Sequence, residues 1–222
     1  MIAKNLINYM IPPLKVTDEI SKASLWMEEL RLSELPVTDQ GKFLGLYTEG
    51  LLYDQPVDQS TTVGDCPLEG RESIVHHDSH YYDVLKTAYA NGVRLVAVRD
   101  DQDQYIGVIS IEDIVEAFAR TLSVNTPGAI LVLSLNQRDY VLSDICRIIE
   151  LNEAKVLSSQ TLHHSDETEK LTLTLKINKE EVSHIISSLE AKGYHVSESF
   201  NKSPLNDRDK EYFDGLMNYL KF

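Results

Sequence analysis

Apolar residues in the first half of the chain alternate between helical spacing and short runs typical of strands, and the same order of segments occurs twice. Each copy predicts a strand, a helix, two strands and a second helix. A shift of about sixty residues superimposes the copies, which indicates an internal repeat. Neither copy can bury both faces of so small a sheet alone, so we expect the two to pack together. The positions that pair across the repeat are Asp18 with Asp78, Leu25 with Leu85, Asp39 with Asp100, Gly45 with Gly107 and Thr48 with Ser110.

The second half of the chain predicts a separate α/β unit in the order βαββαβ. This order is that of a ferredoxin-like sheet with two helices on one face. The predicted strands are 129–135, 154–162, 171–177 and 194–197, and the predicted helices are 140–151, capped by Asp139, and 180–189, capped by Asn178. Residues 123–128 form a short linker containing Pro127 and Gly128. The tail, 201–222, has apolar residues at helical spacing over 209–222, which predicts an amphipathic C-terminal helix.

Composition narrows the class of protein. The 222 residues are 42% hydrophobic and 25% charged, as in a soluble globular protein, and the net charge is −14. Clustered lysines and arginines are absent from the sequence, which argues against binding to nucleic acid or to an anionic membrane. The sequence has no apolar run long enough to cross a bilayer, and residues 1–10 lack the features of a signal peptide. We therefore expect a cytoplasmic protein.

Candidate catalytic and metal-binding residues are few. Cys66 and Cys146 lie far apart without a CxxC motif, so two ordinary reduced thiols are expected. The histidines gather at His76, His77 and His80 and again at 163–164. The first group straddles a strand and a helix start, so its side chains need not converge, and we expect no metal. The sequence shows no nucleophile motif and no P-loop, so no catalytic residue is assigned and an enzyme with an unrecognised site is the weak alternative.

Residues 107–114 carry the most informative local pattern, a strand that runs through a hydroxyl residue into a helix. Ser110 is an N-cap type of residue, and Asp113 follows at capping-box spacing. The hydroxyl can satisfy a helix amide or face an anion beside the positive helix end, and the carboxylate can take two hydroxyls of a sugar. The pattern by itself leaves a plain helix start and a ligand contact both open.

The repeat resembles a tandem pair of cystathionine-β-synthase (CBS) domains, a Bateman module, over about residues 1–122. The resemblance rests on Leu-Pro-Val-Thr-Asp at 35–39 with Leu-Gly-Leu-Tyr-Thr at 44–48, and on Ala-Val-Arg-Asp at 97–100 with Ile-Gly-Val-Ile-Ser-Ile-Glu-Asp-Ile at 106–114. It implies regulation, with an adenosine ligand such as AMP, ADP, ATP or S-adenosylmethionine between the repeats. Ser110 would approach a phosphate, Asp113 would take the ribose hydroxyls, and Arg94 could contact a phosphate. The first repeat departs from the motif because Leu51 stands where the aspartate belongs.

Residues 129–200 resemble an ACT domain, and the stretch from Leu135 to Ile145 carries that resemblance. It implies a small effector such as an amino acid, held by the first loop at a dimer interface. The matching positions are Asn136, Gln137, Arg138 and Asp139. A sheet used only for dimerisation is the alternative, because a ferredoxin-like fold does not specify function.

We therefore expect a CBS pair formed by repeats 1–60 and 61–122, the linker, the ACT-like domain and the tail. The whole resembles bacterial CBS–ACT proteins of the acetoin-utilisation type. The expected function is that of a non-catalytic, homodimeric ligand sensor that needs no cofactor. The alternative is an adaptor with empty pockets that binds another, unknown protein.

Overall fold

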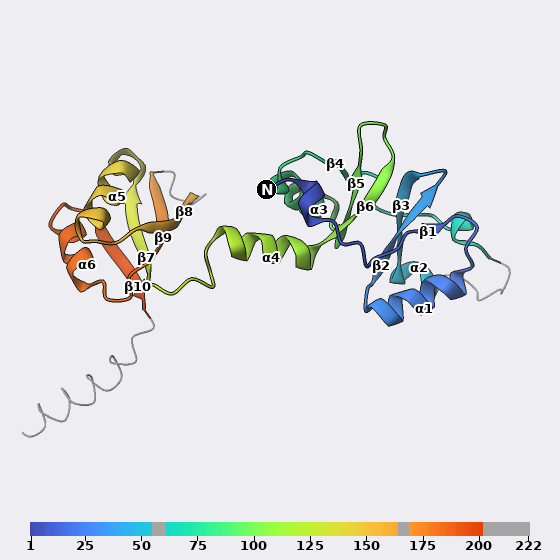
Figure 1. Ribbon diagram of the computed structural model, residues 1–222, viewed down its shortest axis with the longest axis horizontal. Helices are drawn as coiled ribbons and strands as arrows, with labels where there is room; N and C mark the ends of the chain where they lie inside the picture. The colour runs from blue at the N-terminus through green and yellow to red at the C-terminus, as the bar shows by residue number, and fades with distance from the viewer. Residues whose placement is uncertain (55–60, 164–168, 202–222) are drawn as a thin grey trace, which may run out of the picture. The chain divides into compact units, whose positions relative to one another are not determined.

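The computed structural model describes residues 1–54, 61–163 and 169–201 (Figure 1). The chain divides into two compact units, Met1–Phe118 and Ala119–Phe222. Within the described residues, no helix combines the length and apolarity needed to cross a membrane. The helix expected over 209–222 and the second histidine of the pair at 163–164 lie outside the described residues. Cys66 and Cys146 are both free thiols, as predicted.

Unit 1 consists of two copies of one small α/β motif, which confirms the predicted repeat. In each copy a three-stranded sheet pairs its first two strands in parallel and its last two antiparallel. One helix connects the parallel strands, and a second follows the last strand (Figure 1). The elements are β1 (Leu14–Lys15), α1 (Ile20–Leu30), β2 (Glu34–Asp39), β3 (Lys42–Thr48) and α2 (Glu49–Asp54), then β4 (Ile74–His76), α3 (Tyr81–Asn91), β5 (Leu95–Arg99), β6 (Tyr105–Ser110) and α4 (Ile111–Thr121).

The offset between the copies is 61 residues at the first helix, not sixty. Ala23 and Met27 are the buried residues of α1, and Val84 and Ala88 occupy the same positions in α3. The pairings of Asp18 with Asp78 and Leu25 with Leu85 are therefore wrong by one residue. Leu25 is apolar but 52% exposed, so matching it to another leucine shifted the two copies by one residue.

The pairings in the last two strands are confirmed. Gly45 lies opposite Val37 in the first sheet, and Gly107 lies opposite Val98 in the second. Thr48 and Ser110 likewise occupy the same place at the ends of their sheets, opposite Glu34 and Leu95.

The two copies exchange their first segments. The 3-10 turn η1 (Ala3–Leu6) packs on the second copy, where the Ala3 amide donates to the Ser79 carbonyl at 2.9 Å. The equivalent turn η2 (Val63–Asp65) packs on the first copy, where the Val63 amide donates to the Asp18 carbonyl at 2.8 Å. Each copy thus completes the other, and the two form one unit.

Unit 2 is a four-stranded antiparallel sheet in the order β10-β7-β9-β8, and one core cluster joins it to both helices. The order of elements along the chain is the βαββαβ order that the sequence pattern predicts. Leu131 and Leu133 of the sheet pack with Ile145 and Ile185 of the two helices, which places the helices on one face (Figure 1). The elements are β7 (Ile130–Asn136), the 3-10 turn η3 (Gln137–Asp139), α5 (Leu142–Leu151), β8 (Val156–His163), β9 (Lys170–Ile177), α6 (Ser183–Glu190) and β10 (His195–Phe200).

Both predicted N-caps of unit 2 are wrong. The α5 helix follows Val141, which makes no side-chain cap, and Asp139 ends η3. Asn178 lies five residues before α6, where its side-chain oxygen accepts a hydrogen bond from the Lys155 amide at 2.6 Å. Asp and Asn stabilise loops by the same hydrogen bonds that cap helices, so their presence alone does not locate a helix start.

Candidate ligand-binding site

The start of α4 is held by a reciprocal capping box. Asp113 Oδ2 accepts hydrogen bonds from the Ser110 amide at 3.0 Å and from the Ser110 hydroxyl at 2.5 Å. The Asp113 amide in turn donates to Ser110 Oγ at 3.1 Å, and Ser110 is only 4% exposed. Asn8, from the exchanged N-terminal segment, also donates to Asp113 Oδ2 at 3.3 Å. The predicted helix start is thereby confirmed, and the same carboxylate ties the two copies together.

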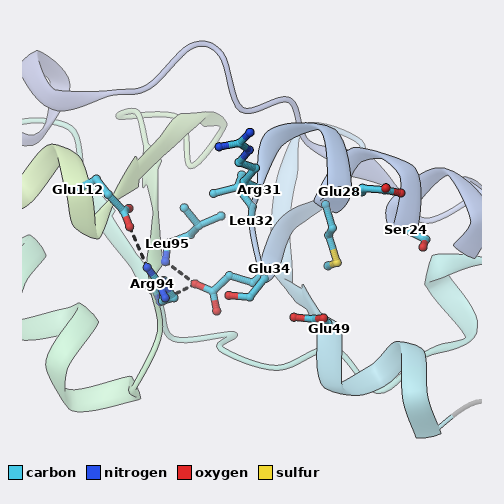
Figure 2. A pocket seen from close by; sticks show the side chains of 11 residues that line it. Ser24, Glu28, Arg31, Leu32, Glu34, Glu49, Arg94, Leu95 and Glu112 are labelled. Atoms are coloured by element: carbon cyan, nitrogen blue, oxygen red, sulfur yellow. Dashed lines mark hydrogen bonds and ion pairs between the residues drawn. The ribbon is translucent and has the colours of Figure 1, made fainter.

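A cavity of about 560 Å³ opens beside this helix start, between the two copies (Figure 2). Its wall comes from one face of α1, from the first residues of β2 and β5, and from the first turns of α2 and α4. The lining residues are Ser24, Met27, Glu28, Arg31, Leu32, Ser33, Glu34, Glu49, Arg94, Leu95 and Glu112. Of the three predicted nucleotide contacts, Arg94 lines this cavity, whereas Ser110 and Asp113 are bonded to each other and do not line it.

Glu34 is the most constrained polar group of the cavity. Its side chain reaches from the first copy to the second, where one carboxylate oxygen accepts hydrogen bonds from the Arg94 and Leu95 amides (Figure 2). The residue is only 7% exposed. Burial disfavours the charged carboxylate and raises the pKa of Glu34, although the two amide hydrogen bonds oppose that shift. The sequence does not reveal this contact, because nothing local to residue 34 indicates partners sixty residues away.

The guanidinium of Arg94 points to Glu112 instead of the capping box. Arg94 Nη2 lies 2.8 Å from Glu112 Oε1, and each side chain is 63% exposed. Desolvation works against ionisation of Glu112, but hydrogen bonds from its own amide and from Arg94 lower its pKa overall. An exposed ion pair of this kind is worth about 0–1 kcal/mol, so a ligand can displace it at little cost.

The cavity as a whole is acidic. Its wall holds four glutamates and two arginines. One of the arginines, Arg94, is already paired with Glu112. An added anion would therefore enter a region of negative potential unless it brought its own cation.

The first copy lacks the carboxylate that caps α4. Leu51 stands at the position of Asp113, and its side chain is 7% exposed within the hydrophobic core of unit 1. The two helix starts thus share a backbone but differ in chemistry.

The predicted effector positions of unit 2 form an exposed turn. Asn136 Nδ2 donates to Asp139 Oδ2 at 3.0 Å, and the Gln137 amide donates to the Glu169 carbonyl at 2.8 Å. The Arg138 guanidinium lies 3.6 Å from a Glu169 carboxylate oxygen, with both side chains at least 80% exposed. Two cavities of unit 2, of about 640 and 420 Å³, are lined by other residues. The structure therefore gathers the four positions in one turn but not around either of these cavities.

Comparison with known proteins identifies part of unit 1. Residues 72–120 match the family model of the CBS domain. The chain therefore contains a CBS domain. This span starts just before β4 and includes the capping box of α4.

Solved structures of CBS proteins match about half of this chain. A CBS domain pair/ACT domain protein from Thermotoga maritima, 21% identical, covers 55% of this chain and 99% of its own, with a TM-score of 0.50. The CBS domain of a bacterial CNNM/CorC family Mg²⁺ transporter in complex with ATP, 16% identical, covers 52% and 85%, with a TM-score of 0.44. The protein CBSX2 in complex with AMP, 15% identical, covers 54% and 96%, with a TM-score of 0.43.

Proposed function

We propose that this chain is a non-catalytic regulatory protein that binds an adenosine-type ligand in unit 1. The observation that carries the proposal is the cavity of about 560 Å³ between the two copies of a repeat that contains a CBS domain. The first turns of two helices line it, and amide groups and helix dipoles at such turns suit the polar parts of a nucleotide. A ligand that prefers one arrangement of the copies would shift the population toward it, which is all that sensing requires.

The charges of the cavity rank the candidate ligands. Four glutamates and two arginines favour a ligand with little or no net negative charge. Without divalent cations, we therefore expect adenosine or S-adenosylmethionine to bind more tightly than AMP, and AMP more tightly than ADP or ATP. Each additional phosphate adds negative charge beside four glutamates, which outnumber the two arginines of the wall.

Each predicted contact has a defined role in this proposal. Oδ2 of Asp113 already accepts three hydrogen bonds, so the ribose hydroxyls would bind its other oxygen, Oδ1. Binding there requires the ligand to extend from the cavity around the first turn of α4. Arg94 would leave Glu112 and contact a phosphate where one is present.

Isothermal titration calorimetry of the full chain with adenosine, AMP, ATP and S-adenosylmethionine tests this function. Asp113→Asn keeps an acceptor for the Ser110 amide but removes the carboxylate, so it should weaken binding about tenfold without unfolding the helix. Asp39→Asn, at the exposed end of β2 and outside the cavity wall, is the matched control and should bind as the wild type does. Failure of all four ligands to bind the wild type more tightly than about 1 mM would refute the proposal.

Two observations favour a second candidate, an adaptor whose CBS pair binds no ligand. Glu34 already occupies the Arg94 and Leu95 amides, and Leu51 replaces a carboxylate in the first copy. The cavity would then stabilise only the contact between the copies, and the outer surface would bind another protein. The adaptor is favoured over the sensor if none of the four ligands gives a heat of binding and a co-purifying protein remains bound to the Asp113→Asn variant.

For unit 2 we propose an ACT-like role, in which the turn of Asn136, Gln137, Arg138 and Asp139 binds a small effector such as an amino acid at a homodimer interface. The support is the βαββαβ order and the clustering of these polar groups in one turn. Thermal shift with each free amino acid tests the effector, and no shift with any of them would leave dimerisation alone. Light scattering that shows a monomer at every concentration would contradict the homodimer.

A further inference from the structure

Two histidines and an aspartate meet at the carboxyl edge of the second sheet. His76 is the last residue of β4 and pairs with Arg99 of β5. Because β4 and β5 run parallel, the residues that follow them emerge at the same edge. His77 begins the turn after β4, and its amide donates to the Arg99 carbonyl at 2.9 Å. Asp101 lies two residues beyond the end of β5, which brings it to the same place.

The donor atoms of these side chains converge. Asp101 Oδ1 lies 3.1 Å from His76 Nε2 and 3.4 Å from His77 Nε2. One donor atom from each of the three residues lies within 4.8 Å of the others. Ligand atoms of a tetrahedral zinc site with bonds of ~2.0–2.1 Å are about 3.3 Å apart, so both distances to Asp101 already suit a shared cation. The two histidine nitrogens lie within 4.8 Å of each other.

Asp78 orients the first histidine for this purpose. Asp78 Oδ1 lies 2.5 Å from His76 Nδ1, on the opposite side of the ring from Asp101. A proton on Nδ1 satisfies this contact and leaves the lone pair of Nε2 directed at Asp101 and His77. A carboxylate behind a histidine is the common outer partner of a metal-binding imidazole.

From this arrangement we propose that His76, His77 and Asp101 form a binding site for a divalent transition-metal ion of the zinc type, with Asp78 as a positioning residue. Two imidazoles and one carboxylate suit Zn²⁺, Co²⁺ or Ni²⁺ better than Mg²⁺ or Ca²⁺, which prefer oxygen ligands. The side chains of His76 and Asp101 are 32% and 70% exposed, so the remaining coordination positions face solvent and would hold water. The site needs no nucleotide, so it stands independently of the sensor function.

The grouping differs from the one that sequence spacing suggests. His80 lies close in sequence but caps α3, where its Nδ1 accepts from the Tyr82 amide. Asp101, 24 residues further along the chain than His77, takes the third position. The parallel pairing of β4 with β5 brings Asp101, and not His80, beside His76 and His77.

Calorimetry of the full chain with Zn²⁺, after removal of bound metal with a chelator, tests the site. We expect one Zn²⁺ per chain, bound more tightly than about 1 mM, and a Zn²⁺-dependent rise in melting temperature. His76→Gln, His77→Gln and Asp101→Asn should each weaken binding about tenfold or more, and Asp78→Asn should weaken it about 10–100-fold. His195→Gln, a matched control in unit 2, should bind as the wild type does.

A second readout keeps the test independent of variant folding. Co²⁺ bound by the wild type should show visible absorption bands that differ from those of hydrated Co²⁺, and the bands should disappear when Zn²⁺ is added. Circular dichroism of the metal-free proteins identifies any variant that fails to fold. The proposal is overturned if the wild type binds no Zn²⁺ in this range, or if folded His76→Gln and Asp101→Asn proteins bind it unchanged.

Discussion

The two copies of the repeat in unit 1 have the same backbone at their last strand but different chemistry at the helix that follows. Gly45 and Gly107 have φ angles of +149° and +150°, and each lies against the segment exchanged from the other copy. After each glycine strand a helix begins, at Glu49 in one copy and at Ile111 in the other. One start contains Leu51, buried in the core, and the other contains Asp113 in a capping box.

This contrast separates two kinds of constraint. The glycines are required because another stretch of chain packs directly on them, which is a demand of the fold. The residues at the helix starts differ with their surroundings: a helix can begin with or without a side-chain cap, and Leu51 packs in the core of unit 1 where its counterpart Asp113 is hydrogen-bonded. The fold therefore repeats, while the carboxylate at the helix start is present in only one copy.

The largest change in the free energy of unfolding should come from placing the carboxylate of the second copy at the equivalent position of the first. Leu51→Asp buries a carboxylate in the core of unit 1 and should destabilise it by about 3–5 kcal/mol. The reverse change, Asp113→Leu, loses only a cap, at a cost of about 1 kcal/mol. Urea unfolding followed by the fluorescence of Trp26, the only tryptophan in the chain, reports on unit 1. Equal stability of the two variants would contradict the asymmetry.

The glycines should be the next most sensitive positions. A Cβ on Gly45 would lie 2.7 Å from the Glu69 carbonyl oxygen, whereas one on Gly107 would lie 2.4 Å from the Cγ2 methyl of Ile7. Backbone yields less readily than a side chain, so Gly45→Ala should cost about 3 kcal/mol and Gly107→Ala about 2 kcal/mol.

Gly92→Ala is the control for these two variants. Gly92 has a φ of +64° with no atom within 4 Å of the added Cβ, so only backbone strain of about 1 kcal/mol is expected. The same unfolding assay measures all three variants. A loss for Gly92→Ala as large as that for Gly45→Ala would show that packing of the exchanged segment does not matter.

The capping box should contribute a smaller amount, and as one unit. Ser110→Ala and Asp113→Ala should each cost about 1 kcal/mol, because the Ser110 hydroxyl accepts from the Asp113 amide and the Asp113 carboxylate accepts from the Ser110 amide. The double variant should cost less than the sum, since both single variants lose the hydrogen bond from the Ser110 hydroxyl to Asp113 Oδ2. Full additivity in a double-mutant cycle would show that the two side chains act separately.

The smallest expected effect depends on pH and concerns Glu34, whose counterpart in the second copy is Leu95. Because the folded-state pKa of Glu34 is raised, the folded protein holds its proton more strongly than the unfolded chain does. Its contribution to stability is thus fully present below the unfolded pKa and is lost as pH rises through the folded pKa. Glu34→Gln keeps an acceptor for the two amides and carries no charge.

The measurement for Glu34 compares unfolding free energies near about pH 4 and about pH 7. Relative to the wild type, Glu34→Gln should become more stable as pH rises between these values. Other carboxylates titrate in both proteins and cancel in the difference. A difference that is constant or has the opposite sign would show that Glu34 remains charged in the folded state without penalty.

Local features of the fold were predictable from the sequence, and contacts between distant segments were not. The capping box at Ser110 and Asp113 follows from a spacing of three residues, and the strands follow from short apolar runs. The pairing of Leu25 with Leu85 was wrong by one residue, and Leu25 is apolar yet half-exposed. Hydrophobic spacing predicts a helix well, but neighbouring elements decide which of several apolar positions is buried.

The sequence by itself determined the repeat, the βαββαβ order of unit 2 and the helix start at Ser110, because each depends on residues close together along the chain. Only the tertiary structure decided which polar groups meet. Glu34 reaches amides sixty residues away, and Asp101, rather than His80, joins His76. The physical reason is that strand pairing and the exchange of segments between copies bring these residues together, and side chains that meet in this way leave no periodic pattern in the sequence.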